Sequence, residues 1–212
     1  MTSKPSILTT AVIVLLSLAG AAHATEWQLA KQKNGVSVWT APIDTQRVNL
    51  YRAETILDHP LDKVLAALRD VGRYSEWMND CHQGRVIAQS DANNYSTYML
   101  WDLPFPFKDR EFVQQVSIRE LANGVEMSVS PIPDKLPINS KYVRVNSAQI
   151  QWVLTSLASN KTKAVQTGYA DPAGRLPVSM INRFVENGPY QTMDELRGWL
   201  VKQKKLDLQS QS

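Results

Sequence analysis

The chain has 212 residues, of which 43% are apolar and 20% charged, and this composition excludes a disordered or collagen-like chain. A single cysteine excludes a disulfide scaffold, and a net charge of +3 is too small to indicate nucleic-acid binding. The length predicts one globular domain with one substantial core.

The first 24 residues have the pattern of a secretory signal peptide. Lys4 precedes an apolar run over residues 7–20, and Ala22-His23-Ala24 provides the small-x-small site that signal peptidase reads. A membrane anchor is the alternative, but the run is shorter than the roughly 18–20 residues that span a bilayer. We expect cleavage after Ala24, a mature domain of residues 25–212 and a periplasmic location.

The first third of the mature chain predicts two strands and two helices. Residues 35–40 and 49–57 have the alternation and the β-forming composition of strands. Pro60 then opens a helix, because Leu61, Val64 and Leu68 follow with helical spacing. A second, short helix is predicted over residues 74–78.

The rest of the chain predicts a run of strands and a final helix. The strands are expected over residues 83–90, 94–102, 110–121, 124–130, 141–155 and 162–170. Asn123-Gly124 is typical of a tight hairpin between two of them. The final helix is expected from residue 178 to about residue 205, and Gly188-Pro189 should kink or break it.

This order of elements predicts an α+β domain. Consecutive strands with short connections form an antiparallel sheet, and one amphipathic helix at the end can cover only one of its faces. A long, twisted sheet curls around such a helix. An interior space that side chains do not fill is then expected, and we interpret it as a ligand cavity.

Motifs of catalytic and metal sites are absent from the sequence. It has no metal-ligand spacing, nucleophile elbow, dinucleotide-binding glycine motif or phosphate-binding loop, so we expect no catalytic residue, no metal and no cofactor. Cys81-His82 is the one pair that could act as a thiol and its base. Adjacent residues on an extended segment point to opposite faces, which favours an inert thiol.

Arg110 is placed unusually for a charged residue. Two prolines among aromatic residues interrupt strand pairing over residues 101–109. In the following strand, alternation puts Arg110 on the same apolar side as Phe112 and Val116. A guanidinium there keeps its charge and must be paired or hydrogen-bonded. The alternative is an arginine at the strand end that reaches water.

An ordered set of stretches resembles the START (steroidogenic acute regulatory protein-related lipid transfer) domain, which belongs to the helix-grip (Bet v 1-like) superfamily. The stretches are residues 51–54, 70–78, 101–106, 109–113, 142–144, 171–177 and 181–182. Residues 109–113, for example, read Asp-Arg-Glu-Phe-Val. Together the stretches cover essentially all of the mature chain, and the ordered set is specific although no single stretch is diagnostic.

The resemblance implies a curved antiparallel sheet folded over a long C-terminal helix, with a hydrophobic tunnel for one lipid. It also implies a non-catalytic carrier, here expected to be a monomer, that contacts membranes transiently. Arg110 matches the arginine that lines the family's cavity and often pairs with an acidic group on the preceding strand. That strand, residues 95–101, has no acidic residue here. Arg110 is therefore expected to pair from another strand or to meet a lipid headgroup.

The expected ligand contacts come from the sheet and from the final helix. They are Arg110, Met99, Trp101, Phe112, Val116 and Trp152 from the sheet, and Met180, Ile181 and Phe184 from the helix. Plain core packing is the alternative for each. Residues 130–140 contain three prolines, and we interpret apolar Leu136 and Ile138 as a gate loop that touches the membrane. A rigid, proline-braced connection is the alternative for this segment.

Two other classes of function stay open. One is an enzyme of the helix-grip fold, such as a cyclase or hydrolase-like relative that acts on a hydrophobic substrate. It would need titratable groups that converge in the cavity, and only Arg110 qualifies. The other is a periplasmic protein-binding scaffold with a collapsed cavity. The class of lipid is also open, because a sterol, hopanoid, phospholipid or fatty acid would fit an apolar sleeve.

Overall fold

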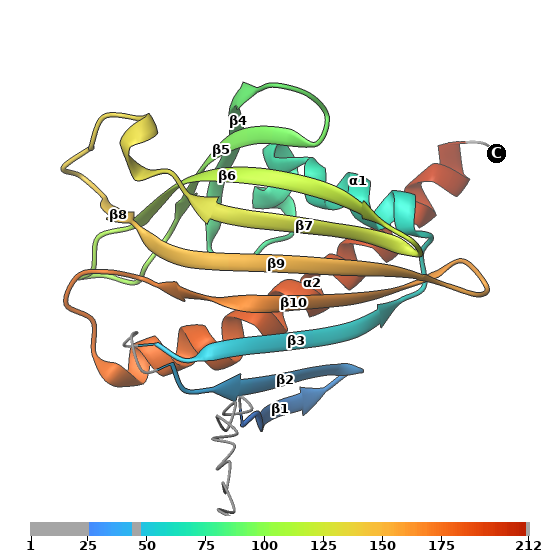
Figure 1. Cartoon of the computed structure of the whole chain (residues 1–212), viewed down its shortest axis with the longest axis horizontal. Coiled ribbons are helices and arrows are strands. Elements are labelled where there is room, and N and C mark those ends of the chain that lie inside the picture. Colours follow the sequence, from blue (N-terminus) through green and yellow to red (C-terminus); the bar gives the residue numbers. More distant parts are fainter. Residues whose placement is uncertain (1–25, 44–47, 211–212) are drawn as a thin grey trace, which may run out of the picture.

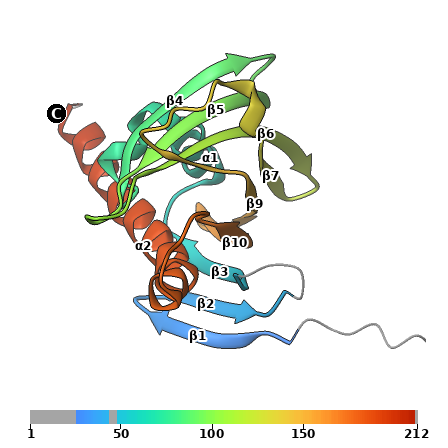
Figure 2. The same ribbon diagram turned by 90° about the vertical axis from the view of Figure 1, so that its left-hand side faces the viewer.

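A curved sheet of ten strands wraps around one long C-terminal helix (Figures 1 and 2). The structure is a computed structural model that describes residues 26–43 and 48–210, so the predicted signal peptide lies outside the described residues. The predicted α+β helix-grip architecture is confirmed. No helix within the described ranges combines the length and the apolar character needed to cross a bilayer.

The first part of the domain supplies three strands and two short helices. They are β1 (Gln28–Lys33), β2 (Val36–Ala41), β3 (Leu50–Leu57), α1 (Leu61–Arg69) and the 3-10 helix η1 (Val71–Glu76). A tight turn at Asn34-Gly35 joins β1 to β2, and both residues have positive φ, 50° and 73°. Asn-Gly is the favoured pair for such a turn, because both residues tolerate positive φ.

The second part supplies the remaining strands and the long helix. They are β4 (Cys81–Gln89), β5 (Asn94–Trp101), β6 (Arg110–Leu121), β7 (Gly124–Pro131), the 3-10 helix η2 (Pro133–Lys135), β8 (Val143–Val145), β9 (Ser147–Leu157), β10 (Lys161–Asp171) and α2 (Val178–Ser210). The predicted hairpin near Asn123-Gly124 is present, since Leu121 pairs with Gly124 across β6 and β7.

Three elements differ from the sequence prediction. β1 was not predicted, because its side chains are almost all exposed and lack apolar alternation. The strand expected over residues 141–155 is two strands, of which β8 pairs in parallel with β6 and β9 pairs with β7 and β10. Of the kink or break predicted at Gly188-Pro189, a break does not occur, because α2 continues through Pro189.

The strand order is β1-β2-β3-β10-β9-β7-β6-β5-β4, and every neighbouring pair in this path is antiparallel. β3 and β10 pair from Leu57↔Thr162 to Tyr51↔Gly168, and this pairing joins the N-terminal strands to the rest of the sheet. β1 and β4 are the two edges. The twist of so many strands curves the sheet, and α2 lies on its inner side (Figure 2).

One end of the space between sheet and helix is closed by η1. β4 crosses η1 at Gly84, where a Cβ would lie 2.2 Å from the carbonyl oxygen of Val71. Only glycine allows this approach. Because β4 and η1 are so close, Val71 and Tyr74 reach the interior beside α2.

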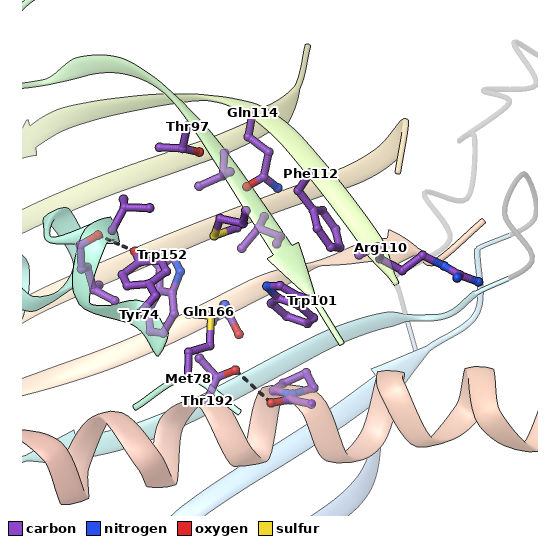
Figure 3. A pocket seen from close by; sticks show the side chains of 18 of the residues that line it. Tyr74, Met78, Thr97, Trp101, Arg110, Phe112, Gln114, Trp152, Gln166 and Thr192 are labelled. Carbon is purple, nitrogen blue, oxygen red and sulfur yellow. Dashed lines mark hydrogen bonds between the residues drawn. The ribbon is translucent and has the colours of Figure 1, made fainter. Parts of the chain in front are cut away.

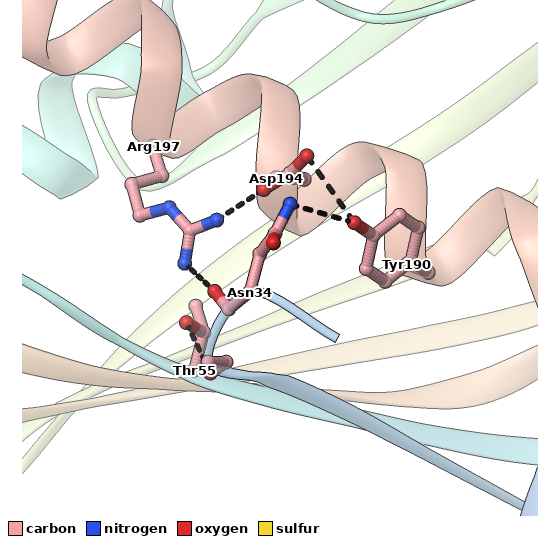
Figure 4. A network of polar contacts seen from close by, with 6 residues as sticks. Asn34, Thr55, Tyr190, Asp194 and Arg197 are labelled. Carbon is pink, nitrogen blue, oxygen red and sulfur yellow. Dashed lines mark hydrogen bonds and ion pairs between the residues drawn. The ribbon is translucent and has the colours of Figure 1, made fainter. Parts of the chain in front are cut away.

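A polar network fastens the C-terminal half of α2 to the turn between β1 and β2 (Figure 4). Arg197 donates to the carbonyl oxygen of Asn34 and forms an ion pair with Asp194. The side-chain amide of Asn34 donates to the hydroxyl of Tyr190 at 3.2 Å. The same half of α2 buries Leu196 in the main core. This half of the helix is therefore held by both polar and apolar contacts.

Candidate ligand-binding site

An apolar pocket lies between the inner face of the sheet, η1 and α2 (Figure 3). Its cavity volume is about 140 Å³. The walls come from β3, β5, β6, β7, β9, β10, α1 and η1, and Phe184, Val185, Gly188, Pro189 and Thr192 of α2 close it. Alternation along each strand sends one set of side chains inward, so the pocket follows from the same pattern that forms the sheet.

Seven of the nine predicted contact residues line this pocket. They are Met99, Trp101, Arg110, Phe112, Val116, Trp152 and Phe184. The structure places Ile181 and Met180 elsewhere, in a smaller apolar cluster with Tyr51 and Leu176 near the start of α2. The helical spacing of the sequence identified an apolar face but could not show which turns of that face border the pocket.

Arg110 is 3% exposed, and its guanidinium is held by backbone carbonyl groups. It donates to the carbonyl oxygens of Lys108 and Pro172, and to that of Ala173 at 3.1 Å. In Figure 3 its guanidinium points away from the other labelled side chains. Arg110 is therefore buried, and it joins the start of β6 to the connection between β10 and α2.

Three polar side chains in the pocket were missed in the sequence. Thr97, Gln114 and Gln166 are buried, and all three line the pocket (Figure 3). The sequence does indicate an inward position for Gln114, because the alternation that places Arg110 and Phe112 on the inner face also places Gln114 there.

The segment that contains Leu136 and Ile138 lies on the outer side of the sheet. Arg144 forms a buried ion pair with Glu111 at 3.0 Å and donates to the carbonyl oxygen of Leu136 at 3.1 Å. Glu111 follows Arg110 on β6, so its side chain is on the face opposite the pocket. Neither Leu136 nor Ile138 is among the residues that line the pocket.

The loop between β5 and β6, residues 102–109, lies at the pocket. Leu103 lines the pocket, and Phe107 packs with the small cluster at the start of α2. Phe105, at the tip, is 96% exposed. The carboxylate of Asp109 accepts a hydrogen bond from the Leu103 backbone N–H at 3.1 Å and so shapes the loop.

Two tyrosines that line the pocket and the buried cysteine are held in their neutral forms. Burial raises the pKa of Tyr51 and of Tyr74 well above the ordinary range. Cys81 is buried, and burial raises the pKa of its thiol to about 11. His82 is exposed, with Nδ1 3.5 Å from Asp102. Within residues 26–43 and 48–210, no group of three or more metal-ligating side chains occurs.

Sequence comparisons identify relatives along most of the chain. The START domain family matches residues 8–205. An uncharacterized protein of Pseudomonas aeruginosa is 26% identical over 191 residues, which cover 90% of this chain and 94% of that protein. START domain-containing protein 10 of mouse is 26% identical over 161 residues, or 74% of this chain, and the chain spans about half of that relative (55%).

Solved structures share the fold. The STAR-related lipid transfer protein fragment from Xanthomonas axonopodis has a TM-score of 0.76 at 26% identity, with 82% of this chain and 98% of that chain covered. Human STARD10 has a TM-score of 0.75 at 20% identity, with 86% and 76% covered. Given the match over residues 8–205, the sheet that grips α2 and the apolar pocket between them, the chain belongs to the START domain family.

Proposed function

We propose that the protein binds a lipid in the pocket between the sheet and α2 and carries it through water without chemical change. The observation that carries this proposal is the apolar pocket on the inner face of the sheet. Each Å² of apolar lipid surface removed from water is worth about 25 cal/mol, so a closed sleeve stabilises a lipid that is far from a membrane. The names of two relatives, the STAR-related lipid transfer protein from Xanthomonas axonopodis and the human StAR-related lipid transfer protein 4, support the same function.

A bound lipid requires the pocket to widen. The cavity volume of about 140 Å³ is close to that of an engineered cavity of about 150 Å³ that holds benzene. Ordinary ligand pockets measure roughly 300–1,000 Å³. The walls that can move apart without breaking the sheet are the 102–109 loop and the first turns of α2, which pack against each other in the small cluster.

We place the entrance, and the transient membrane contact, at the 102–109 loop. Phe105 is exposed at its tip, while Leu103 in the same loop touches the pocket. An exposed aromatic side chain beside an apolar pocket suits insertion into the interfacial region of a membrane. The loop would then open the pocket where the lipid enters.

We also propose that the carrier is exported, is cleaved after Ala24 and acts in the periplasm as a monomer. The pattern of the first 24 residues supports export. A water-filled compartment between two membranes is a place where a lipid needs a protein sleeve. Cys81 is the single cysteine and its thiol is buried, so the domain needs no disulfide bond in an oxidising compartment such as the periplasm.

An enzyme is the second candidate, because one structural neighbour is an aromatase/cyclase. That neighbour, Zhui of Streptomyces, shares the fold with a TM-score of 0.54 at 13% identity. Proton transfer needs a group with a pKa near the working pH. Burial raises the pKa of Tyr51 and Tyr74, which line the pocket, and this supports binding without catalysis.

Protein purified from its natural host, measured by native mass spectrometry and lipid extraction, tests the proposal. One lipid bound per chain, released unchanged by organic solvent, is the expected result. A pocket that is empty in every preparation, together with no uptake of lipid from vesicles, would contradict a carrier. A chemically converted lipid would support the enzyme.

A further inference from the structure

The interior of the pocket contains polar side chains that use none of their hydrogen-bonding capacity on other described residues. Thr97 and Gln114 are each 2% exposed, and Gln166 is 7% exposed. All three line the pocket, and their side chains make no hydrogen bond to another residue of the described chain. Thr192, on the opposite wall, differs because its hydroxyl donates to the Gly188 carbonyl at 3.0 Å.

Such groups are costly unless something in the pocket bonds to them. A buried carboxamide without a partner loses its hydration and gains nothing, whereas leucine or methionine at the same site would be favourable. Thr97 and Gln114 are directly paired across β5 and β6, so their side chains are neighbours on one face. A single ligand group can reach both.

Gln166 adds a second carboxamide from another part of the sheet. It lies on β10, which is separated from β6 by β9 and β7 in the strand order. Curvature of the sheet brings both glutamines to one pocket (Figure 3). Each carboxamide offers two N–H donors and one carbonyl acceptor, so either one can serve a ligand group that both donates and accepts.

The same region has no charge to offer an ion. Among the described residues that line the pocket, Arg110 is the only charged one, and its guanidinium already donates to three carbonyl oxygens at the pocket's edge. A phosphate or carboxylate beside Gln114 would lose its hydration without gaining a cation. A hydroxyl or an amide loses far less hydration and recovers it from the side chains of Thr97 and Gln114.

We propose that Thr97, Gln114 and Gln166 form a subsite that selects lipids with an uncharged hydroxyl or carboxamide at the buried end. This inference rests on the proposed function and names its substrate class. Sterols, long-chain alcohols and lipid amides fit the subsite, whereas a lipid whose buried end is ionised does not.

Three probes with the same C12 chain test the subsite: 1-dodecanol, dodecanamide and dodecanoate. Delipidated protein is titrated with each at about pH 8, where dodecanoate is ionised, and the dissociation constants are compared. We expect the alcohol and the amide to bind at least about tenfold more tightly than the carboxylate. A carboxylate that binds as tightly as the other two would overturn the proposal.

Variants of the two glutamines show which side chains cause the difference in affinity between the probes. Gln114→Leu and Gln166→Leu should each weaken dodecanamide binding about tenfold and leave dodecanoate nearly unchanged. Gln114→Leu should also raise the melting temperature of the ligand-free protein, because an unpartnered buried amide is removed. Gln115→Leu is the matched control: Gln115 is the next residue on β6, bonds to Ser96 on the other face, and should leave all three affinities unchanged.

The outcomes separate the two proposals. If none of the three probes binds, lipid binding itself is contradicted. A different result is that all three probes bind, and that both Gln114→Leu and Gln166→Leu keep the affinity of the original protein for dodecanamide. In that case the subsite is contradicted and lipid binding stands.

Discussion

Arg110 connects three parts of the chain through one side chain. Its guanidinium reaches the carbonyl oxygens of Lys108, Pro172 and Ala173, and the last two belong to the connection that leads into α2. Ala173 and Gly174 in this connection have positive φ, 56° and 67°, so the turn is a special conformation. Arg110 therefore stabilises the start of α2 as well as the pocket wall.

Arg110→Met should destabilise the protein by about 2–4 kcal/mol, because three buried carbonyl groups lose a charged donor. Arg119→Met is the control on the same strand. Arg119 is exposed and its ion pair with Glu126 spans 2.8 Å at the surface, so its loss should cost less than about 1 kcal/mol. Urea unfolding measures both. Equal losses would show that the carbonyl contacts of Arg110 contribute little.

His59 is buried just before α1 and titrates abnormally. Burial lowers the pKa of His59 below its ordinary 6.5, and Lys204 lowers it further, while a backbone hydrogen bond with Leu200 and the charge of Asp58 oppose the shift. The unfolded chain therefore takes up a proton at a pH where folded His59 does not.

The free energy of unfolding should fall as the pH decreases below about 6.5, until folded His59 is itself protonated. His59→Phe should remove this dependence between about pH 6.5 and 5.5, since no proton is then taken up at this site on unfolding. His82→Phe should keep it, because His82 is exposed. Chemical unfolding at a series of pH values measures the slope. An unchanged slope in His59→Phe would contradict the assignment.

Single residues were predictable where alternation decides their face. The period of two in β6 placed Arg110, Phe112 and Val116 on the inner face, and the structure places all three at the pocket. The partners of Arg110 were not predictable. They are backbone carbonyls of residues distant in sequence, and a carbonyl group has no side-chain signature.

At the level of elements, α2 consists of two differently held halves. After Pro189, Tyr190 and Leu196 belong to the main core and the polar network binds the β1–β2 turn. Before it, Ile181 and Val185 belong to the small cluster, and Asn187 accepts a hydrogen bond from Lys31 of β1 at 2.6 Å. Pro189 lacks the N–H that would donate to the Val185 carbonyl, so the helix is weakest at the boundary. We therefore expect the first half to move more easily than the second.

Gly188→Phe should fill the pocket without disturbing the fold. A Cβ at Gly188 meets no heavy atom within 4 Å, and Gly188 lines the pocket. We expect lipid binding to fall at least about tenfold, or about 1.4 kcal/mol. Gly198→Phe is the matched control, since Gly198 is exposed on the same helix and its Cβ also meets nothing. Equal binding by both variants would place the lipid elsewhere.

Phe105→Ser should slow lipid transfer between vesicles roughly tenfold, because burial of a phenyl ring in a membrane is worth about 1.5–3 kcal/mol. Equilibrium binding of lipid should not change. Ile138→Ser removes another exposed apolar side chain, 78% exposed, on the segment tied to the outer face by Arg144. If Ile138→Ser slowed lipid transfer and Phe105→Ser did not, the entrance would lie at the 130–140 segment instead.

Elements were predictable where apolar periodicity is strong, and less so where pairing or loops decide. The long strands β5, β6, β7 and β10 were predicted nearly in full, and burial alternates clearly along β7 and β10. β1 is an edge strand whose order comes from hydrogen bonds to β2. The 130–140 segment has no period, so its apolar residues could not be assigned to a face.

For the whole molecule, the order of elements and the family resemblance together predicted the fold and the pocket. The strand order, with β10 beside β3, was not predictable from alternation, because alternation identifies faces and not neighbours. The small cavity volume was also beyond the sequence. It depends on how closely side chains from six strands and α2 pack.

Removal of the signal peptide is a prediction about the whole chain. Protein recovered from the periplasm of its host should begin at Thr25, which N-terminal sequencing determines. Replacement of Ala22 and Ala24 by larger residues should block cleavage and leave the precursor attached to the membrane. A recovered chain that begins at Met1 and is found in the cytoplasm would contradict export.

The pairing of β3 with β10 has a consequence for the order in which the molecule assembles. β3 ends at Leu57 and its partner begins only at Lys161, so most of the domain must be synthesised before the N-terminal strands find their neighbour. α2, which closes the core, follows last. Contacts so distant in sequence form slowly, so we expect the complete sheet to close only after almost the full length of the chain has left the ribosome.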